Sequence, residues 1–108
     1  MLALVYFMKY RKQKVYSITR RLHASIRASK GSLFLRKIKG CHGFYDEATE
    51  VIFIDYRKEF IPTIIHEFLH KWHSDKSESW VLKEEHKIVN SLTTRQIQNI
   101  LKVLVEIF

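Results

Sequence analysis

His66, Glu67 and His70 form an H-E-x-x-H motif, and these three residues carry the clearest chemistry in the 108-residue chain. On a helix, side chains at positions i and i+4 lie on one face, so two imidazoles with this spacing can bind a single zinc ion. The glutamate after the first histidine lies about 100° further round the helix, where its carboxylate can reach a water molecule beside the metal. The motif therefore predicts a zinc site with His66 and His70 as ligands and Glu67 as general base.

The residues around the motif predict an amphipathic helix over about residues 61–73. Pro62 suits a first helical turn, where the missing N–H has no intrahelical acceptor to lose. One broad apolar stripe follows at helical spacing and consists of Ile64, Ile65, Phe68, Leu69 and Trp72. The two histidines lie beside this stripe, at the edge of the predicted core, and Glu67 lies on the polar side, facing a cleft.

A catalytic zinc site usually has three protein ligands and one position open to water. The chain lacks the glycine and third histidine that follow the motif in metzincins, so the third ligand comes from elsewhere. Capping and turn residues at 74–77 end the first helix and begin a second over about residues 77–90. A loop this short predicts antiparallel neighbouring helices, which brings Glu78 close to His70. Three other side chains remain alternatives for the third ligand: Glu85, Asp75 and His73.

Residues 66–81 resemble small, minimal zincins of the gluzincin type, including phage and bacterial metallopeptidase-like proteins. The shared pattern is H-E-x-x-H, a short loop with an Asp, and Ser/Asp-Glu-x-x-Val opening the next helix; here these residues are Asp75, Ser77, Glu78 and Val81. Residues 40–55 look like the strand pair that precedes the zinc helix in such proteins. The resemblance covers about residues 40–90 and implies a zinc metallopeptidase with Glu78 as third ligand, although Glu78 follows His70 more closely than in thermolysin-like enzymes.

The charge of the chain is unevenly distributed. Residues 1–45 carry eleven Lys/Arg and no Asp/Glu (+11), and residues 46–108 carry eight Lys/Arg and eleven Asp/Glu (−3), which together make the net +8. A basic half joined to an acidic catalytic half predicts a polyanionic partner, such as nucleic acid, contacted through residues 9–39. The peptide or protein substrate is what the metallopeptidase resemblance implies. The basic half also allows a more distant resemblance to SprT-like proteases, which act on DNA-bound proteins, although their third ligand is a distal histidine.

Two functions other than catalysis remain open on the sequence. One is a non-catalytic interaction domain stabilised by zinc, with His73 or Asp75 as a fourth ligand. The other is a basic nucleic-acid-associated protein whose histidines are incidental, for which steeply salt-dependent DNA binding would be the sign.

The single cysteine, Cys41, excludes an intrachain disulfide and a cysteine zinc cluster. It favours a reducing compartment, and hence an intracellular, cytoplasmic location. The apolar segment 2–8 is too short to span a bilayer and lacks the features of a signal peptide, so it is expected to begin a strand or a helix. The length of the chain predicts one domain, residues 1–108.

The order of the patterns predicts an α+β, minimal zincin-like domain. We expect a small antiparallel or mixed sheet of two to four strands, an N-terminal helix, a metal-binding helix and two C-terminal helices. The remaining elements are a basic helix over 10–29, strands over 32–39, 44–45 and 51–54, and a last helix over 94–107 with Thr93 as its N-cap.

In a zincin, an edge strand lies along the cleft, and an extended peptide adds to it as a further strand. Here residues 44–46 or 50–55 would be that strand. Three side chains near it are candidate donors to a developing oxyanion: His42, Tyr45 and Tyr56.

Overall fold

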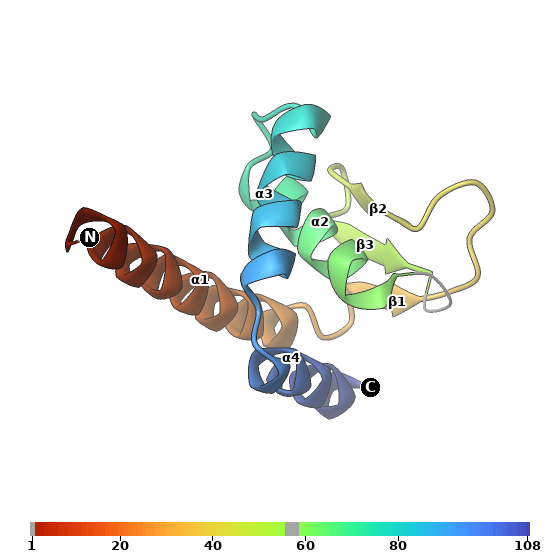
Figure 1. The fold of residues 1–108 in the computed structure, drawn as a ribbon. Helices are drawn as coiled ribbons and strands as arrows, with labels where there is room; N and C mark the ends of the chain where they lie inside the picture. Colours follow the sequence, from red (N-terminus) through yellow and green to blue (C-terminus); the bar gives the residue numbers. More distant parts are fainter. Residues whose placement is uncertain (1, 56–58) are drawn as a thin grey trace.

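The helix that carries the H-E-x-x-H motif, α2 (Phe60–Trp72), packs against one face of a small sheet, as the computed structural model shows (Figure 1). The structure describes residues 2–55 and 59–108, with side chains from residue 14 onward. The other elements are α1 (Leu2–Ala28), β1 (Leu33–Leu35), β2 (Gly43–Asp46), β3 (Val51–Ile54), α3 (Glu78–Ser91) and α4 (Thr94–Ile107). The expected α+β fold, with one N-terminal helix and two C-terminal helices, is confirmed.

The sheet is mixed, with strand order β1-β3-β2. β1 pairs with β3 in parallel, and β2 pairs with β3 in antiparallel orientation. β3 is therefore the central strand, so the prediction that residues 50–55 could lie open along the cleft is wrong. β2 is an edge strand of the sheet, which agrees with the alternative prediction that residues 44–46 lie along the cleft.

Side chains of the three strands alternate between a covered and an open face, as a period of two requires. Leu33, Ile52 and Ile54 are buried beneath the helices. On the open face Phe34, Phe53 and Phe44 stack across the strands, with ring centroids 5.7 and 4.7 Å apart. These aromatic pairs join all three strands and help to hold β2 in place beside α2.

β1 is shorter than the predicted strand over 32–39. It ends at Leu35, which is 37% exposed although it lies on the same face of the strand as the buried Leu33. The N–H of Arg36 still donates to the Ile54 carbonyl at 3.0 Å, and after it the chain leaves the sheet, where the N–H of Ile38 donates to the buried Asp55 carboxylate at 3.0 Å. A loop rather than a strand therefore leads from Arg36 to His42.

The apolar stripe of α2 forms the centre of the core, as predicted. Ile64, Ile65, Phe68 and Leu69 are buried, and Trp72 is partly buried against them. The Trp72 indole N–H donates to Ser25 Oγ on α1 at 3.0 Å. These contacts fix the rotation of α2, and with it the direction in which the two histidines point.

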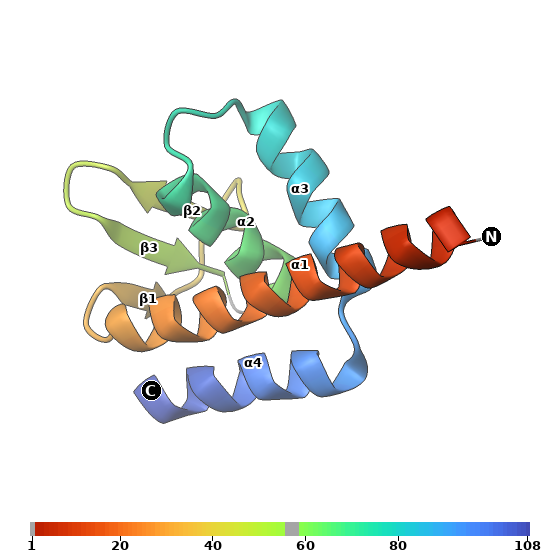
Figure 2. The same ribbon diagram turned by 90° about the vertical axis from the view of Figure 1, so that its left-hand side faces the viewer.

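α1 begins at Leu2 rather than near residue 10, so the apolar N-terminal segment starts a helix. α1 and α4 lie side by side beneath α2 and α3 (Figure 2). Ser77 caps α3, and Thr93 caps α4 in a capping box with Gln96, as the predicted N-cap requires. No helix in the described part of the chain is long and apolar enough to cross a membrane.

Candidate metal centre

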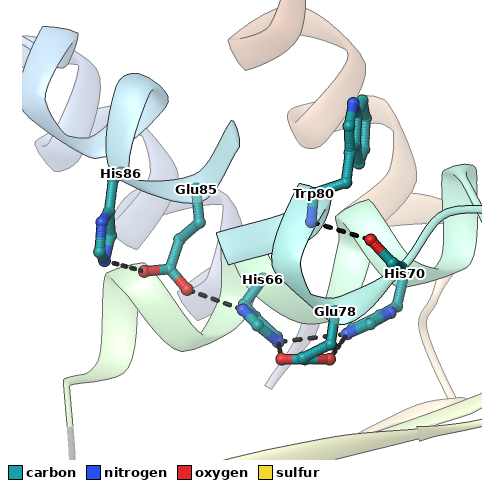
Figure 3. Close-up of polar contacts among 7 residues, drawn as sticks. His66, His70, Glu78, Trp80, Glu85 and His86 are labelled. Atoms are coloured by element: carbon teal, nitrogen blue, oxygen red, sulfur yellow. Dashed lines mark hydrogen bonds and ion pairs between the residues drawn. The ribbon is translucent and has the colours of Figure 1, made fainter. Parts of the chain in front are cut away.

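Three side chains from α2 and α3 converge on one point. His66 Nε2 and His70 Nε2 lie 3.2 Å apart on α2, and each is 2.7 Å from a different carboxylate oxygen of Glu78 (Figure 3). Glu78 reaches them because α3 runs antiparallel to α2 after a short loop, as predicted. One ligand atom from each residue lies within 4.8 Å of the others, and the group could hold a metal ion.

The donor set fits a cation with tetrahedral preferences. Zinc–nitrogen bonds of 2.0–2.1 Å place neighbouring ligands about 3.3 Å apart in a tetrahedron. The separation of the two Nε2 atoms, 3.2 Å, is close to this value. Glu78 is largely exposed and the histidines are partly buried, so the cluster is open to solvent on the side of Glu78.

Glu85, an alternative third ligand in the sequence, lies on the opposite side of the His66 ring. Its Oε1 is 2.8 Å from His66 Nδ1, while His66 Nε2 faces Glu78 and His70 (Figure 3). A carboxylate that accepts from Nδ1–H places the lone pair of the imidazole on Nε2, where a metal ion would bind. If His66 holds a metal, Glu85 would orient this ligand, a role that the sequence did not indicate for Glu85.

The other two alternatives do not join the cluster. Asp75 is exposed in the loop between α2 and α3. The ring of His73 packs edge-on against Trp80, with centroids 4.9 Å apart, after α2 has ended. His73 leaves the face of His66 and His70 because it is the C-cap residue, with φ −130° and ψ 58°.

Glu67 lies beside the cluster but is far less exposed than a position on the polar side implies. Its side chain is 5% exposed, yet it lines the hollow that contains both histidines and Glu78. Burial raises the pKa of the Glu67 carboxyl to about 7; His66 opposes this shift, and the nearby Glu78 and Glu85 add to it. A carboxyl with this pKa can take and release a proton near neutral pH.

Two hollows of about 360 Å³ each open on either side of the ligand cluster. They share four wall residues, namely Gly43, His66, Glu67 and Glu78. A Cβ atom on Gly43 would lie 2.7 Å from the Phe53 carbonyl oxygen and 2.9 Å from Thr63 Cγ2 on α2. The absence of a side chain therefore lets β2 pack closely on α2 and form the wall of the site.

The predicted oxyanion donors have different positions. Tyr45 lines the hollow on the His70 side, and burial, with smaller contributions from Glu50, Glu47 and Asp46, raises its pKa, so the phenol keeps its proton. His42 lines the other hollow and lies 3.8 Å from Glu59. Tyr56 lies outside the described residues.

Several cations predicted to contact a polyanion through residues 9–39 already have intramolecular partners. Arg21 lies over the Trp72 ring, Arg27 is 3.3 Å from Glu106, and Arg36 lies over the Phe53 ring. Contact of this region with a polyanion stays a prediction.

Comparisons of the chain with protein-family models, with curated proteins and with solved structures find no match.

Proposed function

We propose that this chain is a zinc-dependent peptidase of the gluzincin type. The observation that carries the proposal is the convergence of His66, His70 and Glu78 beside the nearly buried Glu67, in a cleft bordered by the edge strand β2. Two imidazoles and one carboxylate are a common ligand set of catalytic zinc. Glu78 in the cluster favours the gluzincin resemblance over the SprT-like one, which needs a distal histidine.

The open cleft favours catalysis over a purely structural metal. Structural zinc sites are usually closed by four protein ligands. In the described part of the chain the cluster has three, and neither His73 nor Asp75 joins them. The cluster is open to solvent at Glu78, which leaves room for water and substrate.

In the proposed reaction, zinc at this site would supply the Lewis acidity that activates a water molecule and polarises the peptide carbonyl. Glu67 takes the proton of the attacking water and delivers it to the leaving amine nitrogen. Glu85 holds His66 in the tautomer that presents Nε2. The N–H and C=O groups on the free edge of β2 bind an extended substrate backbone, and the Tyr45 phenol donates to the carbonyl oxygen.

The test compares Glu67→Gln with wild type, both purified without a histidine tag or added metal. We expect both proteins to hold about one zinc per chain, because glutamine keeps the shape of the wall, whereas hydrolysis of a peptide mixture falls about 10²- to 10⁴-fold. Metal content is measured by mass spectrometry and cleavage by the appearance of new peptide termini.

The matched control is Glu84→Gln, which makes the same change at a side chain that pairs with Lys87 outside the cluster. His66→Ala should lose both metal and activity. Wild-type protein that binds no zinc, or a Glu67→Gln variant that keeps full turnover, would refute the proposal.

A further inference from the structure

The cleft differs in charge from the rest of the molecule. Five of the side chains that line its two hollows are glutamates, and none of the described lining residues is a lysine or an arginine. The whole chain, by contrast, has 19 Lys/Arg against 11 Asp/Glu. A cleft whose described lining holds five glutamates and no lysine or arginine, in a chain with net charge +8, calls for an explanation.

Three of the five carboxylates already have a role. Glu78 faces the two histidines, Glu85 orients His66, and Glu67 stands beside the ligand cluster. Glu47 and Glu59 have no such role. Neither forms an ion pair with a described lysine or arginine. Among the described residues, Glu59 has His42 as an ion-pair partner at 3.8 Å, and Glu47 has none.

These two carboxylates lie in different hollows. Glu47 directly follows β2 and lines the hollow that contains His70, whereas Glu59 directly precedes α2 and lines the hollow that contains Glu85. Glu59 is near His42, which precedes β2. The two carboxylates therefore lie near opposite ends of β2, with the ligand cluster between them.

A substrate strand beside β2 would pass both carboxylates. β2 has four residues, and an extended chain rises about 3.3 Å per residue. A peptide whose central bond lies over the ligand cluster thus presents its side chains about two residues away on each side to Glu47 and Glu59. The carboxylate at each end of β2 attracts a cationic side chain of the peptide. The positive charge on the rest of the molecule repels a cationic peptide from other surfaces.

We infer that the cleft selects peptides with a lysine or arginine on both sides of the central bond, and that Glu47 and Glu59 are the selecting residues. The inference rests on the proposed peptidase function for the reaction, but binding tests the selection without turnover. Exposed carboxylates act mainly through screened charge, so the preference is moderate and falls as salt rises.

The experiment uses the zinc-loaded Glu67→Gln protein and three fluorescein-labelled octapeptides, measured by fluorescence anisotropy. The peptides differ only at positions 3 and 6, which are lysine in one, glutamine in the second and glutamate in the third. In about 50 mM salt we expect the lysine peptide to bind about tenfold more tightly than the glutamine peptide, and the glutamate peptide most weakly. Near 1 M salt the three affinities should converge.

Two pairs of substitutions, both made in the same background, separate a local effect from net charge. Glu47→Gln with Glu59→Gln should reduce the preference for lysine below twofold. Glu84→Gln with Glu106→Gln removes the same charge outside the cleft and should leave the preference intact.

Equal binding of the lysine and glutamine peptides, no measurable binding of the lysine peptide, or a preference that survives the cleft substitutions would overturn the inference. A lysine preference in a protein whose wild type cleaves no peptide would refute the peptidase and leave the selection standing. Cleavage by wild type without enrichment of lysine or arginine near the cut bond would support the peptidase and refute the selection.

Discussion

His66 has a carboxylate at each of its ring nitrogens, Glu85 at Nδ1 and Glu78 at Nε2. Because Glu85 fixes the tautomer that leaves Nε2 free to bind metal, we expect Glu85→Ala to weaken zinc binding about 10- to 100-fold. Glu85→Gln keeps an acceptor oxygen without the charge and should have a smaller effect. Competition with a chromophoric chelator measures the affinity, with Glu84→Gln as control. Wild-type affinity in Glu85→Ala would show that His66 is held by other contacts.

The sequence predicts part of this centre because some of its geometry is local. The positions of His66, Glu67 and His70 follow from the repeat of one helix, and a short loop brings Glu78 to His70. The sequence could not separate Glu78 from Glu85, since both lie on one face of α3. Two helical turns, about 10 Å along α3, separate the two glutamates. Because of this separation, Glu78 reaches Nε2 of His66 and Glu85 reaches Nδ1 of the same ring.

At the scale of elements, the closeness of β2 to α2 depends on Gly43. In Gly43→Ala the new methyl group would meet the Phe53 carbonyl and Thr63 at less than 3 Å and push β2 away. We expect the free energy of unfolding to fall by about 1–3 kcal/mol. Zinc affinity should persist because no ligand lies on β2, whereas peptide binding in the cleft should weaken. Urea denaturation and fluorescence anisotropy measure the two effects.

Gly40→Ala is the contrasting variant. Its methyl group meets nothing within 4 Å, although its φ of +92° strains an alanine. It should lose stability without losing peptide affinity. If Gly43→Ala binds peptide as well as wild type, β2 does not form the substrate wall.

Element types were predictable because apolar spacing distinguishes strands from helices, and the caps at Ser77 and Thr93 are local signals. The end of β1 was not predictable. It depends on the contact of Ile38 N–H with Asp55, which the fold brings together from 17 residues away. The central place of β3 likewise depends on a parallel pairing with β1 that no local pattern specifies.

At the scale of the whole molecule, the packing of α1 on α4 makes stability depend on pH through His23. Its Nε2 is buried and has no hydrogen-bond partner among the described atoms. Burial lowers the pKa of His23, Arg27 lowers it further, and Glu106 opposes the shift. Both the folded and the unfolded chain keep this histidine neutral well above pH 6.5. As the pH falls, the unfolded chain binds the proton first, so stability is lost from about pH 6.5 downward through the folded-state pKa.

A His23→Leu variant isolates this effect, since leucine has a similar size and takes up no proton. We expect its advantage over wild type in free energy of unfolding to widen steadily between pH 7 and pH 5. The comparison is made by urea denaturation of metal-free protein, so that the histidines of the metal centre contribute equally to both chains. Parallel stability curves would mean that His23 is protonated as readily in the folded chain as in the unfolded one. The α1–α4 interface would then admit the charge without cost, and any acid sensitivity of the fold would have to arise at other titratable groups.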